Sequence, residues 1–124
     1  MSELENLRKD LEATIDALTK TAHRLKGSAR ETANKRSDYE NKKNGYLIQL
    51  AAEDAESGNK PRTIALQTAM YRLMFKDERQ AHLLAEADYE SDRDLFKGIM
   101  AKLNALQSLL RITETEMRLG ENFH

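Results

Sequence analysis

The sequence predicts an all-α protein whose main feature is a long antiparallel helical hairpin. In each half of the chain, apolar and aromatic residues recur at intervals of seven, the repeat of helices that pack side by side. A single cluster of turn-forming residues separates the two halves. Charged residues make up 33% of the 124 residues and aromatic residues 6%, which is typical of long helices rather than of sheets. Because the apolar residues keep a regular period, the pattern excludes a disordered chain.

The first arm of the hairpin is expected to span residues 3–56. One heptad position holds Leu4, Leu11, Leu18, Leu25, Thr32, Tyr39 and Tyr46. Its companions on the same face are assigned as Leu7, Ile15, Ala22, Ala29 and Leu50. Gly27, followed by a capping-box pattern from Ser28 to Glu31, predicts that this arm is kinked or split near residue 27. The heptad phase continues across the glycine, which favours a kink, and a three-helix arrangement stays open as the alternative.

The turn is expected at residues 57–61, where Gly58 and Asn59 precede a proline suited to the first turn of a helix. The second arm then covers residues 62–119. Its repeat is carried by Phe75, His82, Tyr89, Phe96, Leu103, Leu110 and Met117, flanked by Ile64, Tyr71, Ala85, Ile99 and Leu106. Both arms belong to one helical domain, residues 1–124. Such a slender hairpin buries few side chains alone, so we expect copies to assemble into an oligomeric helical bundle.

Charge is distributed unevenly between the two arms. Residues 20–43 contain eight Lys and Arg against three acidic residues, whereas residues 86–94 contain five acidic residues against one Arg. A hairpin centred near residue 59 places residue 30 opposite residue 88, so the two stretches face each other. They either pair with each other and set the register, or leave cations free for a phosphate backbone. The sequence leaves both interpretations open.

Catalytic patterns are scarce. The chain has no Cys, which excludes disulfides, zinc-finger ligand sets and thiol chemistry. It contains no phosphate-binding glycine loop, HExxH pair or nucleophile elbow. Glu78, His82 and Glu86 repeat at four-residue steps, a spacing compatible with metal ligands, but also with a polar layer that faces Arg36 and its neighbours and sets the register. We favour the polar layer, and we expect no enzymatic activity, no metal and no cofactor.

The order of several short segments is informative about function. These are Asn41-Lys-Lys-Asn-Gly-Tyr-Leu-Ile-Gln-Leu-Ala51, the Ser57-Gly58 turn, Phe75-Lys-Asp-Glu-Arg79, Tyr89 and Leu103-Asn-Ala-Leu-Gln-Ser-Leu-Leu-Arg111. Over residues 40–112 this order resembles the small phage recombination mediators of the UvsY type, and helical proteins encoded beside recombination genes in phages and prophages. The resemblance implies a cytoplasmic homo-oligomer that binds single-stranded DNA and helps to load a recombinase while a single-strand binding protein is displaced.

The resemblance also implies which residues contact DNA. The basic stretch before the turn supplies Lys35, Arg36, Lys42 and Lys43 as candidates. To these we add Lys60 and Arg62, a basic spot beside a predicted helix start, where backbone N–H groups favour anions. With few aromatic residues available for stacking and a net charge of −1, binding is expected to be electrostatic and sensitive to salt.

The alternative function is a non-enzymatic protein-interaction module, such as a phage inhibitor of a host nuclease or defence protein, with residues 86–94 as its contact surface. The opening residues MSELENLRKDLEATI have no apolar core of the signal-peptide type, and no apolar stretch has the length of a membrane span. We therefore expect a cytoplasmic protein without a membrane partner. The sequence leaves open the true binding partner and the number of subunits.

Overall fold

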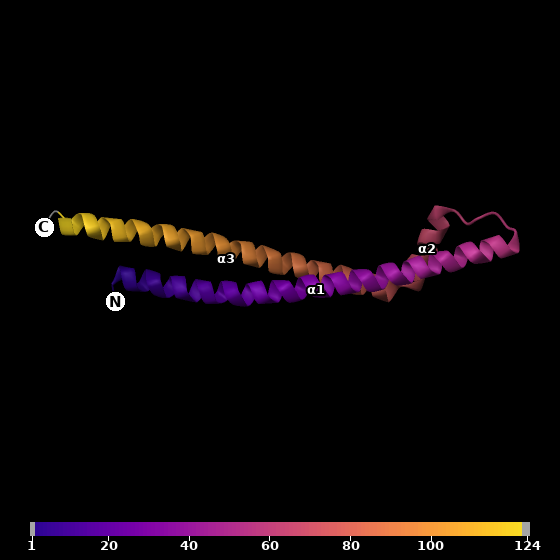
Figure 1. Cartoon of the computed structure of the whole chain (residues 1–124), viewed down its shortest axis with the longest axis horizontal. Helices are drawn as coiled ribbons and strands as arrows, with labels where there is room; N and C mark the ends of the chain where they lie inside the picture. Colours follow the sequence, from indigo (N-terminus) through magenta and orange to yellow (C-terminus); the bar gives the residue numbers. More distant parts are fainter. Residues whose placement is uncertain (1, 123–124) are drawn as a thin grey trace. The chain divides into compact units, whose positions relative to one another are not determined.

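The computed structural model describes residues 2–122, and this part of the chain forms three helices. Helix α1 spans Glu3–Ser57, the short helix α2 spans Ile64–Met74, and helix α3 spans Lys76–Asn122 (Figure 1). The all-α class predicted from the sequence is therefore confirmed. None of these helices, within the described residues, has an apolar stretch long enough to cross a lipid bilayer.

The chain divides into two compact units. Unit 1 combines Met1–Lys26 of the first arm with Glu90–His124 of the second, and unit 2 is the continuous segment Gly27–Tyr89. In unit 1, the N-terminal part of α1 runs beside the C-terminal part of α3 in the opposite direction, and an ion pair of 3.7 Å joins Arg8 to Glu114 (Figure 1). In unit 2, the hydroxyl of Thr32 on α1 reaches the carbonyl of Ala85 on α3 at 2.9 Å. The antiparallel pairing of α1 with α3 is confirmed in each unit.

Local signals explain where α1 begins and ends. The hydroxyl of Ser2 accepts the N–H of Glu5 at 3.2 Å, and Glu3 and Glu5 place negative charge in the first turn, where the helix dipole favours it. At the other end, Gly58 follows the last helical residue with a φ of 68°. This left-handed conformation is the usual helix stop, and glycine adopts it without a steric penalty.

Of the two possibilities left open at Gly27, a kink or a split, the split is wrong, because α1 passes through this residue without interruption. Glycine inside a helix costs about 1 kcal/mol relative to alanine, which is too little to end a helix that is packed on both sides of it. Half-buried Leu25 and Ser28 and buried Thr32 provide that packing, and they keep the alternating spacing of three and four residues across the glycine.

Threonines occupy much of the contact face of α1. Thr14, Thr21 and Thr32 are buried, and each hydroxyl lies 2.7–2.8 Å from the carbonyl oxygen four residues earlier in its own helix. These bonds satisfy polar groups that would otherwise be costly to bury. Small side chains allow the helices to approach closely, but they bury little apolar surface. The buried apolar side chains among the described residues are Tyr39, Leu50, Ala85, Leu103 and Leu106.

The companion positions predicted for this face were partly wrong. Leu7 is half-buried and Leu50 is 3% exposed, as expected, but Ile15 is 46% exposed and Ala22 and Ala29 also face solvent. Thr14, Thr21 and Ser28 hold those positions, each one residue earlier. The prediction assigned the inner face of α1 to apolar side chains. In the structure this face keeps the spacing of three and four residues instead, and a threonine fits there because its hydroxyl bonds to a carbonyl of its own helix.

The second arm is interrupted at Phe75, which separates α2 from α3. Thr63 caps α2 by accepting the N–H of Leu66, and Phe75 at the other end leaves the helical region with φ −112° and ψ 36°. Hydrogen bonds nevertheless continue on both sides, from the Phe75 N–H to Tyr71 and from the Arg79 N–H to Phe75. The interruption is therefore confined to one residue, at which the helix axis changes direction, and it is not a loop. The Phe75 ring packs edge-to-face on Tyr46 with centroids 5.6 Å apart.

Two glycine substitutions test this description of α1. A Cβ atom added at Gly27 would meet nothing within 4 Å, so Gly27→Ala should raise the free energy of unfolding by roughly 0.5–1 kcal/mol. Gly58→Ala is the matched control. It also has open space, but its φ of +68° makes alanine unfavourable by roughly 1–2 kcal/mol.

Chemical unfolding at one fixed protein concentration measures both changes, so that association does not alter the comparison. Destabilisation by Gly27→Ala would contradict a continuous α1 and would indicate that this glycine ends a helix.

Candidate functional site

Four of the six basic residues predicted to bind DNA lie beside carboxylates in the structure. Lys35 Nζ is 3.8 Å from Glu31, and Lys42 Nζ lies 3.6 Å from Asp38 on its own helix and 3.2 Å from Glu78 on α3. The hydrogen bond from Lys42 to Glu78 is the main cause that raises the pKa of Lys42. Lys42 thus joins α1 to α3 within unit 2.

Lys43 lies deeper in the contact face than its neighbour. Beyond Thr32, the inward-facing positions of α1 no longer alternate strictly by three and four residues, and Thr32, Lys43 and Asp54 are spaced at eleven. This spacing turns Lys43 inward, with 23% of its side chain exposed. Its ammonium group is 3.1 Å from Glu40, which raises its pKa, and 5.4 Å from the centre of the Tyr71 ring. Lys43 therefore fastens α2 to α1.

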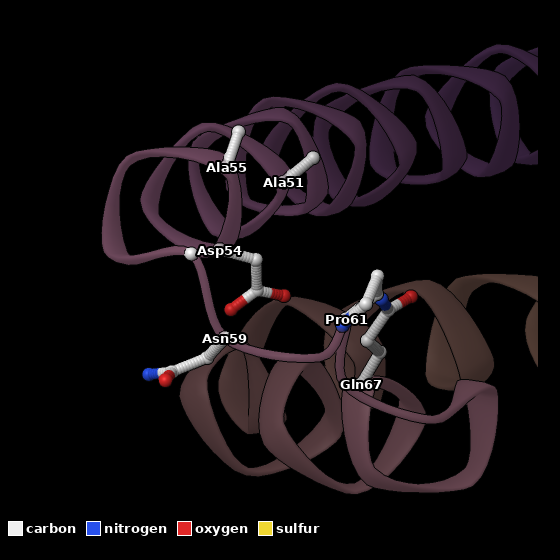
Figure 2. Close-up of a pocket in the computed structure, with 7 residues that line it drawn as sticks. Ala51, Asp54, Ala55, Asn59, Pro61 and Gln67 are labelled. Carbon is white, nitrogen blue, oxygen red and sulfur yellow. The ribbon is translucent and has the colours of Figure 1, made fainter.

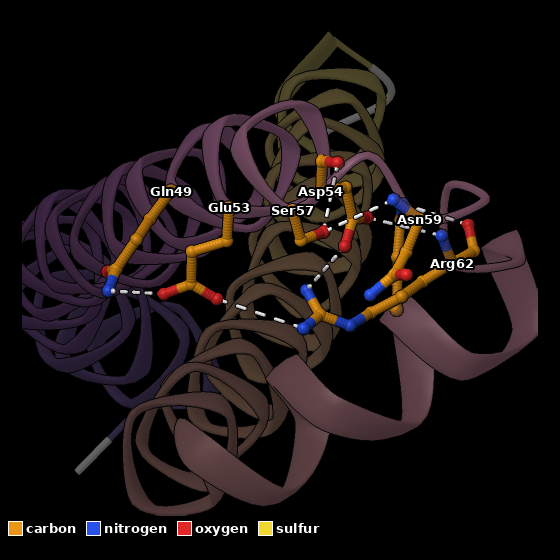
Figure 3. Close-up of polar contacts among 7 residues, drawn as sticks. Gln49, Glu53, Asp54, Ser57, Asn59 and Arg62 are labelled. Atoms are coloured by element: carbon orange, nitrogen blue, oxygen red, sulfur yellow. Dashed lines mark hydrogen bonds and ion pairs between the residues drawn. The ribbon is translucent and has the colours of Figure 1, made fainter.

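Arg62 fastens the loop between α1 and α2 (Figure 3). Its guanidinium group is 3.3 Å from Asp54 and 3.8 Å from Glu53, and its backbone N–H donates to Asp54 at 3.2 Å. The Asp54 side chain is only 11% exposed, so this contact is screened less than a surface ion pair. The loop is held further by Ser57, whose hydroxyl donates to the Asp54 carbonyl and accepts the N–H of Asn59.

A hollow of about 330 Å³ lies beside this loop (Figure 2). Its lining residues are Ala51, Asp54, Ala55, Gly58, Asn59, Pro61 and Gln67. The polar groups in it are largely engaged, since Asp54 accepts from Arg62 and the Gln67 side chain donates to the Arg62 carbonyl at 3.2 Å. Asp54 and Gln67 are thus already occupied by contacts within the protein.

The remaining two candidates, Arg36 and Lys60, are exposed. In the described part of the chain neither forms an ion pair. They are therefore available to an external anion, although they stand far apart in the sequence, one within α1 and the other in the loop.

A cluster of three cations that the sequence interpretation did not single out lies at the junction of α2 and α3. Arg72 at the end of α2 and Lys76 and Arg79 at the start of α3 line a cleft of about 210 Å³, together with Gln80 and Leu83. All three basic side chains are exposed, and in the described part of the chain none pairs with a carboxylate. Three like charges without counter-ions attract a polyanion, and arginine binds phosphate through two parallel hydrogen bonds.

The signal for this cluster was present in the sequence as a spacing. Arg72, Lys76 and Arg79 stand four and three residues apart, which places them on one face of a helix. Local charge totals conceal these cations, because Asp77 and Glu78 offset two of the three positive charges. The structure separates the charges, since Glu78 points to Lys42 on α1.

Glu78, His82 and Glu86 do not converge. Glu78 accepts from Lys42, while His82 Nε2 lies 3.6 Å from Glu86 and is buried without a hydrogen-bond partner. Among the residues that the structure describes, no three His, Cys, Asp or Glu side chains are placed to hold a metal ion. The contact of Glu78 with α1 accounts for its half-buried position.

Comparisons of the chain with protein-family models, with curated proteins and with solved structures give no match.

The contact between Lys42 and Glu78 predicts how stability depends on pH. Two hydrogen bonds lower the pKa of Glu78 below its usual 4.5. The larger effect comes from the backbone of Glu78 itself, and the next from the side chain of Lys42. A carboxylate with a lowered pKa stabilises the fold above the unfolded-state pKa, and this stabilisation is lost as the pH falls through the folded-state value. The wild-type chain should therefore be more stable than Glu78→Gln at neutral pH, with a difference that closes below pH 4.5.

Urea unfolding across this pH range measures the difference. Lys42→Met provides the control, because Glu78→Gln made in a chain that already lacks the Lys42 ammonium group should cost less stability at neutral pH. A difference between wild type and Glu78→Gln that stays constant down to acidic pH would contradict this role of the Glu78 carboxylate.

Proposed function

We propose that the chain is a non-catalytic accessory protein of phage-type DNA recombination that binds single-stranded DNA as a homo-oligomer and assists the loading of a recombinase. The observation that carries this proposal is the cleft of Arg72, Lys76 and Arg79, whose cations have no carboxylate partner in the described chain. The resemblance of residues 40–112 to UvsY-type mediators supports single-stranded DNA as the polyanion.

The contacts of the other basic residues support this choice of surface. Lys42, Lys43 and Arg62 each hold two elements of unit 2 together, and an anion would have to displace a carboxylate to reach them. The cations of the cleft require no such exchange. Arg36 and Lys60 remain as additional contacts, because they too are exposed and without an ion pair in the described residues.

The chemistry of the cleft favours binding without sequence preference. Its polar groups are two guanidinium groups, one ammonium group and the amide of Gln80, which all suit phosphate oxygens. Leu83 is the apolar wall, and the nearby ring of Tyr71 already contacts Lys43. With little aromatic surface for bases, affinity depends chiefly on released counter-ions and falls steeply with salt.

The second candidate function is a protein-interaction module that contacts a host nuclease or defence protein. The observation in its favour is that Asp88, Glu90 and Asp94 are exposed and form no ion pair in the described part of the chain. Binding of a protein partner that is lost on neutralising these three carboxylates would favour this function over DNA binding.

Removing the three cations of the cleft should weaken DNA binding. We expect the combined change Arg72→Ala, Lys76→Ala and Arg79→Ala to lower the affinity for a fluorescent single-stranded oligonucleotide. The slope of log affinity against log salt should become less negative by roughly 2, since each phosphate contact to a single strand contributes about 0.7. Fluorescence anisotropy at several salt concentrations measures both quantities.

The matched control removes three exposed lysines of unit 1 by Lys9→Ala, Lys26→Ala and Lys97→Ala, which changes the net charge equally. This variant should keep nearly the wild-type affinity and slope. Equal losses in the two variants would show that total charge, not the cleft, governs binding. Absence of binding by the wild-type chain at low salt would refute the proposed function.

A further inference from the structure

Helix α3 of unit 1 has a second apolar stripe that nothing in the unit covers. Leu95, Leu109, Ile112 and Leu119 are 47%, 49%, 55% and 52% exposed. Each of these four residues directly precedes, in the sequence, a position on the face of α3 that is turned toward α1, or one that continues this face. Successive residues of an α-helix are about 100° apart, so the stripe lies about 100° around α3 from its contact with α1. Large apolar side chains aligned along one helix face mark an interaction surface rather than chance exposure.

Small and charged residues complete the stripe in a regular order. Gly98 and Ala105 occupy two of its positions, and Lys102 and Glu116 occupy two others. In sequence the stripe therefore contains Leu95, Gly98, Lys102, Ala105, Leu109, Ile112, Glu116 and Leu119, all exposed. Lys102 and Glu116 form no ion pair within the described residues, whereas nearby Glu114 pairs with Arg8.

When two copies of this stripe are aligned antiparallel about Leu109, their residues are complementary. Lys102 and Glu116 lie seven residues to either side, so two antiparallel copies bring opposite charges together twice. The same alignment sets Ala105 near Ile112 and Gly98 near Leu119, which matches small side chains with large ones. A parallel alignment in register would instead set Lys102 against Lys102 and Glu116 against Glu116, and like charges in contact are unfavourable.

We propose that this stripe binds the same stripe of a second copy of the chain, with the two α3 helices antiparallel and Leu109 on the two-fold axis. The contact is isologous, because each copy offers the same surface and each Lys102 meets Glu116 of the second copy. Apolar side chains supply the attraction, and the two charge pairs select the antiparallel orientation.

This inference rests on the homo-oligomer of the proposed function and names the surface that forms it. The stripe belongs to unit 1, whereas the cationic cleft belongs to unit 2. Self-association and DNA binding can therefore be lost separately, which keeps failure of this inference distinguishable from failure of the proposed function.

Cysteine crosslinking tests the orientation directly, because the natural chain has no Cys. Leu109→Cys should form a disulfide-linked dimer in mild oxidant, since the two side chains meet on the axis. Leu95→Cys is the matched control on the same stripe. In the antiparallel dimer the two copies of residue 95 are separated by roughly 40 Å, twice the length of fourteen helical residues at about 1.5 Å each, so no disulfide should form.

The yield is compared with Ile48→Cys, an exposed position in unit 2 that reports random collisions. Efficient crosslinking at 109 and background crosslinking at 95 supports the proposal. Crosslinking at both positions indicates a parallel pair, and background levels at 109 indicate that the stripe is not the interface. Either of these outcomes overturns the inference.

Exchanging the two charges provides a second, independent test. Lys102→Glu or Glu116→Lys alone sets like charges against each other twice and should weaken the dimer roughly tenfold. The double variant with both changes restores opposite charges and should return the dimer dissociation constant to near the wild-type value. Sedimentation velocity over a concentration series measures association, and circular dichroism verifies equal helix content. If the double variant associates as weakly as the two single variants, the Lys102–Glu116 pairing is wrong.

Discussion

The close approach of α1 and α3 at small side chains is the constraint on which the rest of this structure depends. At Thr32 and Ala85 a hydroxyl on one helix reaches a carbonyl oxygen on the other at 2.9 Å, a contact that larger residues would prevent. Buried threonines repeat this solution in unit 1 by bonding within their own helix. The arrangement satisfies polar groups but buries little apolar surface. As a consequence, large apolar side chains remain on the outer faces of the helices, where they are available to a second chain.

The same constraint explains how charge is used. Because the elements bury little apolar surface against each other, ion pairs help to fix how they align. Lys42 with Glu78 and Arg62 with Asp54 are two such pairs. Basic residues employed in this way are poor ligands for DNA. Among the described residues, three cations without an ion pair, Arg72, Lys76 and Arg79, lie together where α2 changes direction into α3 at Phe75, and no carboxylate lines their cleft.

Periodicity in the sequence was sufficient to predict the two long helices and their antiparallel pairing, because the spacing of three and four residues is a property of helix geometry. It was insufficient where spacing and polarity disagree, as at Thr14, which is buried next to the exposed Ile15. The interruption at Phe75 carries no glycine or proline signal, and the contact of its ring with Tyr46 joins residues far apart in the sequence. The cationic cleft was missed for a related reason. Which charges remain free depends on pairing across helices, and the sequence shows only their number.

The central claim is that α1 and α3 of a single chain pair antiparallel in the register observed here. Zero-length carbodiimide coupling tests it most directly, because it links amines only to carboxylates that are already in contact. With a mixture of isotopically labelled and unlabelled protein, peptide mass spectrometry should identify a bond between Lys42 and Glu78, whose atoms lie 3.2 Å apart, within chains of one label. Lys42 to Glu78 bonds that join labelled to unlabelled chains in the proportion expected of random pairing, or Lys42 coupled to a distant carboxylate of α3 instead, would contradict the account.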